Sequence, residues 1–297
     1  MIVVLLIGHL VCAQTHTKTP TNNTADDDMF IERQIVFMDD IIKMYHEVKN
    51  IHLSLEKLYP ITVIHDGFYF VFDFNEMNSK YEFKFKTKLP EYMAGAGNFD
   101  ILASFPLDFY EMKASAVISN KILENSRNHI IIFHEFVHCF QWHNGEQHIR
   151  QELAVEKQEM AKNNFSWELN FPFPYESEYF INKTLELSNA PTYENMVQYH
   201  KDMKSYLQDT EFEYMVWQEW KEGFARYIEN LIRKKYGLAL NSTPIEKPFD
   251  RVLFYEIGNR FIEILTNNDK KLRENIVGLF NQMKFEFVIS EGENDEK

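Results

Sequence analysis

His134, Glu135 and His138 are the residues of this 297-residue chain whose types and spacing most directly indicate chemistry. They form the pattern H-E-x-x-H within the segment HIIIFHEFVHCFQWHNG. Residues four apart lie on one face of a helix, so both imidazoles can reach one zinc ion. Glu135, one position further round, can lie beside the metal without binding it and accept a proton from an attacking water. The pattern therefore predicts a zinc site with its own general base.

The surroundings of this motif favour a metal site over a chance match. The apolar run IIIF directly precedes the motif and predicts a buried helix. Ionisable groups are costly to bury unless a metal or a hydrogen-bond network compensates them. Two histidines and a glutamate in the most apolar part of one helix therefore point to a bound cation.

A catalytic zinc needs a third protein ligand and an open position for water. The metzincin pattern would require Gly at position 141 and His or Asp at position 144, where this chain has Gln141 and Asn144. That spacing excludes the metzincin class and leaves a glutamate from a later helix. The chain offers three candidates: Glu156, Glu159 and Glu222.

The segment WQEWKEGFARYIENL supplies the context in which these candidates differ. Its W-x-E-G-x-A-x-Y pattern resembles the third-ligand helix of many gluzincins, the peptidase-MA-like zinc metallopeptidases. The resemblance implies that Glu222 binds zinc and that Gly223 and Ala225 let two helices approach closely. It implies that Glu219 lies beside the ligand or in solvent.

This resemblance covers roughly residues 100 to 266, and its sharp parts are H-E-x-x-H and E-G-x-A-x-Y. The separation of 84 residues between His138 and Glu222 is longer than in thermolysin-like enzymes. An inserted subdomain between the two ligand helices is therefore expected.

Tyr255 is a second candidate catalytic residue. The segment FYEIG at 254–258 resembles the Y-x-x-G segment that follows the ligand helix in several gluzincin families. A tyrosine there can donate a hydrogen bond to the oxyanion that forms at the attacked carbonyl, and Arg226 is a further candidate for this role. The alternative is that Tyr255 packs in the core of a helix pair.

Other polar residues carry weaker signals. Cys139 follows His138 directly and so points about 100° away on a helix, which predicts a buried thiol and not a ligand. His143, His148 and His200 have no partner at ligand spacing and are expected at the surface or at helix caps.

The N-terminal half contains a helical and then a strand-forming region. Apolar residues recur at helical spacing from Phe30 to Pro60 and predict one or two amphipathic helices. Residues 61–119 contain ITVI, FYFVFDF and YEFKFKTKL, with the turn signal Asp66-Gly67 after the first segment. Such alternating and β-branched segments predict a small mixed or antiparallel sheet.

From about residue 126 to 290 the pattern is mostly helical. Gly145 is expected to end the first helix of this region, and the proline-containing segment 165–180 is expected to form a loop. The resemblance implies an α+β, zincin-like fold with a small sheet, an active-site helix and a mostly helical C-terminal lobe. The expected helices are 127–143, 147–163, 192–208, 211–235, 249–266 and 269–282.

Residues 1–13, MIVVLLIGHLVCA, form an uncharged apolar run that ends in small residues. This predicts a signal peptide, with a buried N-terminal strand as the alternative, followed by a polar linker at 14–28 and a hydrolase domain at 29–290. The run is too short to span a bilayer as an ordinary helix. Leu10-Val11-Cys12-Ala13 resembles a lipoprotein box except at Val11, so a lipid anchor at Cys12 is a second option. The mature protein is accordingly expected outside the cytoplasm.

The formal net charge of −14 argues against a nucleic-acid partner, since such proteins need a basic surface. The resemblance implies a zinc metallopeptidase that acts on a peptide or protein substrate, with water activated by Glu135. Two alternatives remain open: an exported binding protein with structural zinc, and a hydrolase of non-peptide amides.

Overall fold

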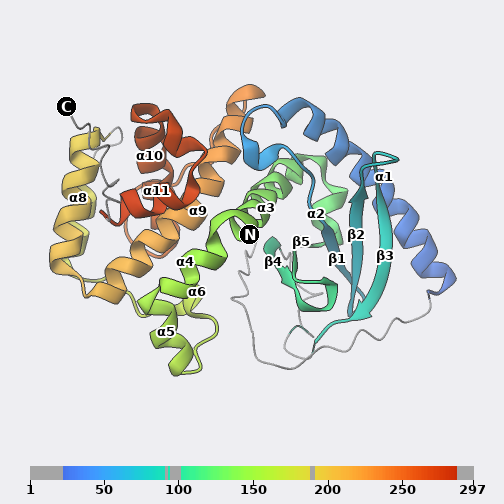
Figure 1. Cartoon of the computed structure of the whole chain (residues 1–297), viewed down its shortest axis with the longest axis horizontal. Coiled ribbons are helices and arrows are strands. Elements are labelled where there is room, and N and C mark those ends of the chain that lie inside the picture. The colour runs from blue at the N-terminus through green and yellow to red at the C-terminus, as the bar shows by residue number, and fades with distance from the viewer. Residues whose placement is uncertain (1–22, 91–92, 94–101, 188–190, 286–297) are drawn as a thin grey trace, which may run out of the picture.

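Five strands form one open, mixed sheet in the computed structural model, which describes residues 23–90, 93, 102–187 and 191–285 (Figure 1). The strand order is β3-β2-β1-β5-β4. β1 runs parallel to β5, and the other neighbouring pairs are antiparallel. The predicted α+β class and mixed sheet are therefore confirmed. The strands are β1 (Ile61–His65), β2 (Phe68–Asn75), β3 (Lys80–Lys88), β4 (Leu102–Leu107) and β5 (Lys113–Ser119).

The hairpin between β1 and β2 turns at the predicted Asp66-Gly67 pair. Both residues have positive φ, 45° and 78°, which suits the two-residue turns that match the twist of the flanking strands. The turn fixes the register, with His65 opposite Phe68. Along β2 the even-numbered Phe70 and Phe72 join the main core, whereas Tyr69 and Val71 join a smaller cluster on the other face.

The helix α1 (Ala25–Val48) packs against the sheet and begins earlier than expected. Thr24 and Asp27 form a reciprocal capping box at its start. The first turn, with Asp26, Asp27 and Asp28, was predicted as the end of the polar linker. That prediction was wrong because a run of acidic residues favours a helix N-terminus as readily as a linker.

The helix α3 (His129–Gln141) does not stop at Gly145. It continues through a π-helical turn (Trp142–Glu146) into α4 (Gln147–Glu152). A Cβ at Gly145 would lie 2.8 Å from a methyl carbon of Val277, so close packing and not chain reversal explains this glycine. The chain then breaks at the extended Leu153 before α5 (Ala154–Ala161).

The C-terminal lobe contains most of the expected helices and two departures. The segment expected as a loop contains the short α6 (Trp167–Asn170) and the start of α7 (Glu178–Glu186). The expected helix 269–282 is a 3₁₀ turn (Lys270–Arg273) followed by α11 (Ile276–Met283), because Asn275 caps a new helix there. The remaining long helices are α8 (Tyr193–Tyr206), α9 (Asp209–Lys235) and α10 (Val252–Asn268).

The short elements complete the description of the chain. They are a 3₁₀ turn (Leu53–Leu55), a second (Asp108–Tyr110), α2 (Asn120–Glu124) and a third 3₁₀ turn (Ser126–Asn128). The predicted leader at 1–13, its Cys12 and most of the predicted linker lie outside the described residues. Export and lipidation therefore stay predictions.

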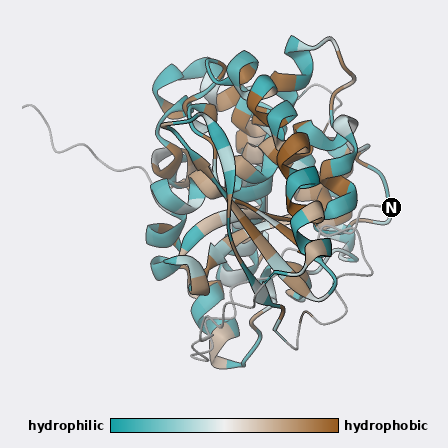
Figure 2. Ribbon diagram, turned by 90° about the vertical axis from the view of Figure 1, so that its right-hand side faces the viewer, coloured by the Kyte–Doolittle hydropathy of each residue, from teal (hydrophilic) through white to brown (hydrophobic). Residues whose placement is uncertain are grey.

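The helix α3 lies between the sheet and α9, in contact with β4 and β5 on one side and α9 on the other (Figure 1). The strands in the middle of the molecule are largely apolar (Figure 2). Cys139 is buried on α3 beside the Ser104 hydroxyl at 3.3 Å, which confirms the expected buried thiol. This arrangement places the H-E-x-x-H helix at the junction of the sheet and the helical lobe.

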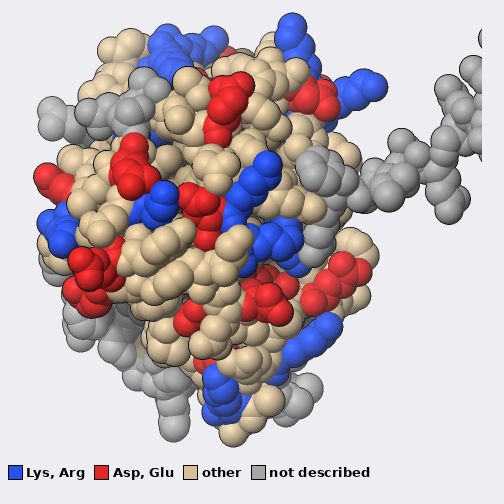
Figure 3. Space-filling view, turned by 90° about the vertical axis from the view of Figure 1, so that its left-hand side faces the viewer, with Lys and Arg blue, Asp and Glu red and all other residues tan. Residues whose placement is uncertain are grey.

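The surface of the helical lobe carries charge of both signs. On the face shown in Figure 3, acidic and basic side chains are interspersed among other residues. A nucleic-acid surface would instead concentrate Lys and Arg on one face. Among the described helices, none combines the length and the apolar composition that crossing a membrane requires.

Candidate metal centre

His134, His138 and Glu222 converge where α3 packs against α9. The Nε2 atoms of His134 and His138 lie 3.8 and 3.6 Å from the same oxygen, Oε2 of Glu222. The candidate ligand atoms of the three residues all lie within 4.8 Å of one another. Ligand atoms at tetrahedral corners about 2.0–2.1 Å from zinc would be roughly 3.3 Å apart. The spacing therefore fits one small cation shared by the three side chains.

The buried carboxylates at this cluster leave oxygens without partners. Within the described part of the chain, Oε2 of Glu135 and Oε1 of Glu222 accept no hydrogen bond although both are buried. An unsatisfied buried acceptor is costly, so its presence calls for a ligand. Two such oxygens beside two imidazoles form the donor set that a divalent cation with a bound water would satisfy.

The outer nitrogens of both imidazoles are held by acceptors that the sequence interpretation missed. Nδ1 of His134 lies 3.1 Å from Oε2 of Glu229, and Nδ1 of His138 lies 2.8 Å from Oε1 of Gln141. Each contact leaves Nε2 directed at Glu222, as a metal-binding histidine requires. Spacing could have indicated both partners, because Glu229 is seven residues after Glu222 and Gln141 three residues after His138 on the same helices.

Gln141 also fixes α3 against α9. Its Nε2 donates to the backbone carbonyls of Trp220 and Lys221, each at 3.2 Å. The residue that orients His138 is thus bonded directly to the turn of α9 that precedes Glu222.

Charges at the cluster reinforce one another. Burial opposes ionisation of Glu222, but the imidazoles of His138 and His134 hold the pKa of Glu222 well below its usual range. Burial likewise disfavours a charged His134, yet the neighbouring carboxylates of Glu222 and Glu229 raise the pKa of His134 to about 10. Burial raises the pKa of Glu135. A carboxyl group with a raised pKa suits proton transfer near neutral pH.

Solvent access to the cluster is uneven. The side chain of His134 is 12% exposed, whereas those of His138 and Glu222 are 2% and 1% exposed. Solvent therefore reaches the cluster from the side of His134.

The other candidate ligands and histidines lie elsewhere. Glu156 binds Arg150 at 2.7 Å, and Glu159 binds Lys162 at 2.7 Å. Neither belongs to the cluster formed by His134, His138 and Glu222. These two residues therefore do not compete with Glu222 for the third position.

His200 and Glu219 form a buried pair that sequence reasoning placed wrongly. Nε2 of His200 lies 2.6 Å from Oε2 of Glu219, and neither side chain is exposed. The prediction of a surface or capping role for His200 is wrong, and Glu219 does not face solvent. The two residues are 19 positions apart in the sequence, and the tertiary contact between α8 and α9 brings them together. His143 and His148, by contrast, are exposed as predicted.

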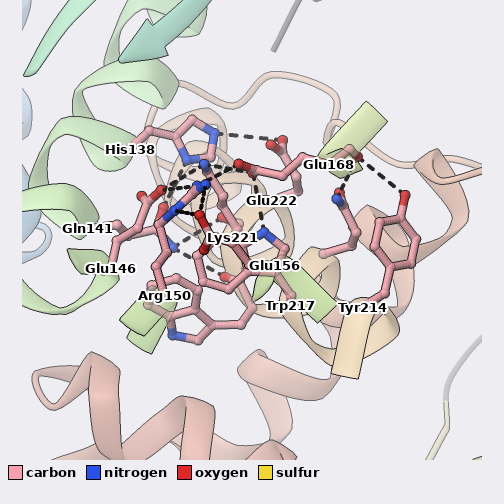
Figure 4. A network of polar contacts seen from close by, with 12 residues as sticks. His138, Gln141, Glu146, Arg150, Glu156, Glu168, Tyr214, Trp217, Lys221 and Glu222 are labelled. Atoms are coloured by element: carbon pink, nitrogen blue, oxygen red, sulfur yellow. Dashed lines mark hydrogen bonds and ion pairs between the residues drawn. The ribbon is translucent and has the colours of Figure 1, made fainter. Parts of the chain in front are cut away.

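A buried ion-pair network adjoins Glu222 through its neighbour Lys221 (Figure 4). Nζ of Lys221 lies 2.9 Å from both Glu146 and Glu168, and Arg150 lies 2.6 Å from Glu168. Burial opposes ionisation of Glu168, but Lys221 and Arg150 hold its pKa far below the usual range. The π-helical turn directs Glu146 into this network, which ties the segment after α3 to α9 beside the metal cluster.

Tyr255 lies near enough to the cluster for the charge of Glu222 to affect its pKa, and its hydroxyl is bound by an arginine that the sequence interpretation did not single out. Arg251, at the start of α10, donates a hydrogen bond to the Tyr255 hydroxyl. Arg226 lies over the Tyr255 ring but donates to Thr243 and Glu256, at 3.1 and 3.3 Å. Burial and then the charge of Glu222 raise the pKa of Tyr255 well above its usual value. The phenol is thus protonated and able to donate.

Comparison of the chain with protein-family models, with curated proteins and with solved structures finds no match.

Proposed function

We propose that this chain is a zinc-dependent hydrolase of the gluzincin type that cleaves peptide bonds. The observation that carries the proposal is the convergence of His134, His138 and Glu222 beside a buried general base, Glu135. The two imidazoles come from one helix and the carboxylate from another, in the order that H-E-x-x-H and E-G-x-A-x-Y predict.

A zincin-like fold is part of the same proposal. In its support, α3 packs on the sheet through β4 and β5 and meets α9 on its other side. The close approach of helices expected from Gly223 occurs against α10, where a Cβ on Gly223 would lie 2.7 Å from backbone atoms of Gly258. This packing fixes the helix that carries Glu222.

The chemistry follows from the placement of the side chains. Zinc held by His134, His138 and Glu222 would polarise the substrate carbonyl and lower the pKa of a water. Glu135 accepts a proton from that water as its oxygen attacks the carbonyl carbon, and then delivers the proton to the leaving amine nitrogen. The Tyr255 hydroxyl donates a hydrogen bond to the oxyanion formed in this step.

The alternative of a purely structural zinc is disfavoured by Glu135. A structural site closes its fourth position with a protein ligand and has no use for an adjacent base. Glu135 instead has a buried carboxylate oxygen without a partner among the described residues. A carboxylate in that state is costly unless it serves a reacting group.

The first experiment measures zinc in the purified chain. About one zinc per chain is expected, because the cluster supplies three protein ligands. His134→Ala, His138→Ala and Glu222→Ala should each lose most of it. Glu156→Ala and Glu159→Ala are the matched controls and should keep it. Full occupancy in both histidine variants would sink the assignment.

The second experiment separates metal binding from catalysis. Glu135→Gln keeps the size of the side chain but removes its basic lone pair, so zinc content and fold should be retained. Turnover of a peptide library should fall by about 10² to 10⁴-fold. Cleavage at the wild-type rate would leave zinc as a structural ion. Activity on simple amides without activity on peptides would point to a non-peptide amidohydrolase.

A further inference from the structure

Arg251 is a partly buried cation whose partner is a tyrosine and not a carboxylate. Elsewhere in the helical lobe, buried cations meet acids: Arg150 and Lys221 bind Glu168, and Arg226 binds Glu256. Across residues 23–90, 102–187 and 191–285, no carboxylate lies within ion-pair distance of Arg251. Burying a cation without a counter-charge is costly. In a chain with a net charge of −14, such a site calls for an anion from outside.

Most hydrogen-bond donors of the Arg251 guanidinium have no acceptor in the described chain. It offers five N–H groups in a planar fork, and within the described chain only the Tyr255 hydroxyl accepts one of them. The Tyr255 ring also lies beneath the guanidinium, with 5.5 Å between Cζ and the ring centroid. Two free N–H groups on one edge match both oxygens of a carboxylate.

The phenol groups of two further tyrosines lie near the Arg251 guanidinium. Burial opposes ionisation of Arg251, but Tyr255 and the more distant charge of Glu222, and after them Tyr214 and Tyr175, raise its pKa. The Tyr175 hydroxyl is buried beside that of Tyr214, and no hydrogen bond of good geometry joins it to the described chain. Tyr175 also lines a pocket of about 310 Å³ together with one acidic and one basic residue, Glu176 and Lys247.

This group of residues adjoins the metal cluster. Arg226, one turn after Glu222 on α9, lies 5.3 Å from the centroid of the Tyr255 ring. Arg251 binds the hydroxyl of that same tyrosine. A substrate group bound by Arg251 would therefore lie close to the bond undergoing hydrolysis.

We propose that Arg251 binds a carboxylate of the substrate, so that the enzyme selects peptides carrying a carboxylate next to the bond it cleaves. This inference rests on the proposed hydrolase function. The carboxylate can come from a free C-terminus, as in a carboxypeptidase, or from an acidic side chain. A guanidinium with both oxygens in its fork discriminates against an amide, which offers one acceptor and no charge.

The test begins with binding, which needs no turnover. The full-length Glu135→Gln variant is loaded with zinc and dialysed against two pools of N-acetylated tripeptides. The pools have the same amino-acid composition, but one has free C-termini and the other has amidated C-termini. A parallel pair of amidated pools differs only by Glu or Gln. Mass spectrometry reads the bound peptides, and one carboxylate pool should bind at least about tenfold better than its neutral counterpart.

Arg251→Gln in the same background should abolish that preference, and Arg251→Lys, which keeps the charge but not the fork, should retain only part of it. Lys247→Gln is the matched control and should leave the preference intact. A melting curve checks that each variant is folded. No enrichment of either acidic pool, or a preference lost through Lys247 and kept without Arg251, would overturn the inference.

Turnover by the wild-type chain separates this inference from the proposed function. If the wild-type chain cleaves peptides and Arg251→Gln lowers the activity equally on acidic and neutral peptides, Arg251 acts on the oxyanion alone. That result would refute carboxylate selection. If the chain binds the acidic pool through Arg251 but cleaves no peptide, the carboxylate site is supported and the proposed hydrolase function is refuted.

Discussion

Replacement of Gly258 by alanine tests the packing that holds the candidate metal centre together. Gly258 lies on α10 where that helix crosses α9. A Cβ at this position would lie 2.2 Å from the carbonyl oxygen of Glu219 and 2.6 Å from its Cα. All three of the nearest atoms belong to the backbone, so no side chain can rotate away. The two helices would have to separate.

The size of the effect follows from those distances. Carbon atoms pack at about 3.5–4.0 Å, so relief of the contact needs a separation of about 1 Å. Overpacking of this kind costs about 1–3 kcal/mol, and a backbone partner places Gly258→Ala at the upper end. The higher helix propensity of alanine offsets at most about 1 kcal/mol of this loss of stability. A net loss of about 2 kcal/mol lowers Tm by about 3 °C for a chain of this size.

The displacement also reaches the metal site. Glu222 is one turn after Glu219 on α9, so it moves with the turn that Gly258 contacts. Metal–ligand distances tolerate only about 0.2 Å, so a shift of about 1 Å should weaken zinc binding together with stability.

Thermal unfolding and zinc titration of the two variants Gly258→Ala and Gly278→Ala provide the assay. Gly278 is also helical, but a Cβ there would meet the side chain of Asn275, 2.5 Å away at Nδ2. That change loses about 1 kcal/mol of capping and gains about as much propensity, so its Tm should stay near the wild-type value. Equal Tm and zinc affinity in the two variants would refute the packing of α9 against α10 described above.

Two further predictions concern pH and metal affinity. Burial lowers the pKa of His52 from 6.5 to about 4, so the unfolded chain takes up more protons in that window and stability should fall as pH falls from 6.5 to 4. At about 1.36 kcal/mol per pH unit the loss is about 3 kcal/mol, and urea unfolding of His52→Gln should lack this component; an unchanged pH profile in the variant would contradict it. Glu229→Ala removes the acceptor from Nδ1 of His134 and should weaken zinc binding about 10 to 100-fold without abolishing it. Chelator competition measures this, with the half-exposed Glu263→Ala as control, and equal affinities would exclude an orienting role for Glu229.

Local sequence determined much of the site because helical periodicity is a local property. The four-residue spacing of His134 and His138 is enough to place two imidazoles on one face, whatever surrounds the helix. The turn at Asp66-Gly67 was predictable for the same reason, since only a few residue types tolerate positive φ. The choice of Glu222 over Glu156 and Glu159 rested on its immediate neighbours, and the structure places it with the imidazoles.

Tertiary structure decided the partners of these residues. Glu229 shares a face with Glu222, but which face of α9 would meet α3 was not encoded in spacing alone. Gly145 has the local character of a helix stop, and packing against Val277 overrides it.

The same holds for the pairs far apart in sequence. His200 and Glu219 meet only because α8 lies against α9, and Arg251 comes near Glu222 only because α10 crosses that helix. A sequence pattern specifies which side chains share an element and a face. The free energy of burying those faces against one another, summed over the whole core, determines which elements meet, and therefore which charges become neighbours.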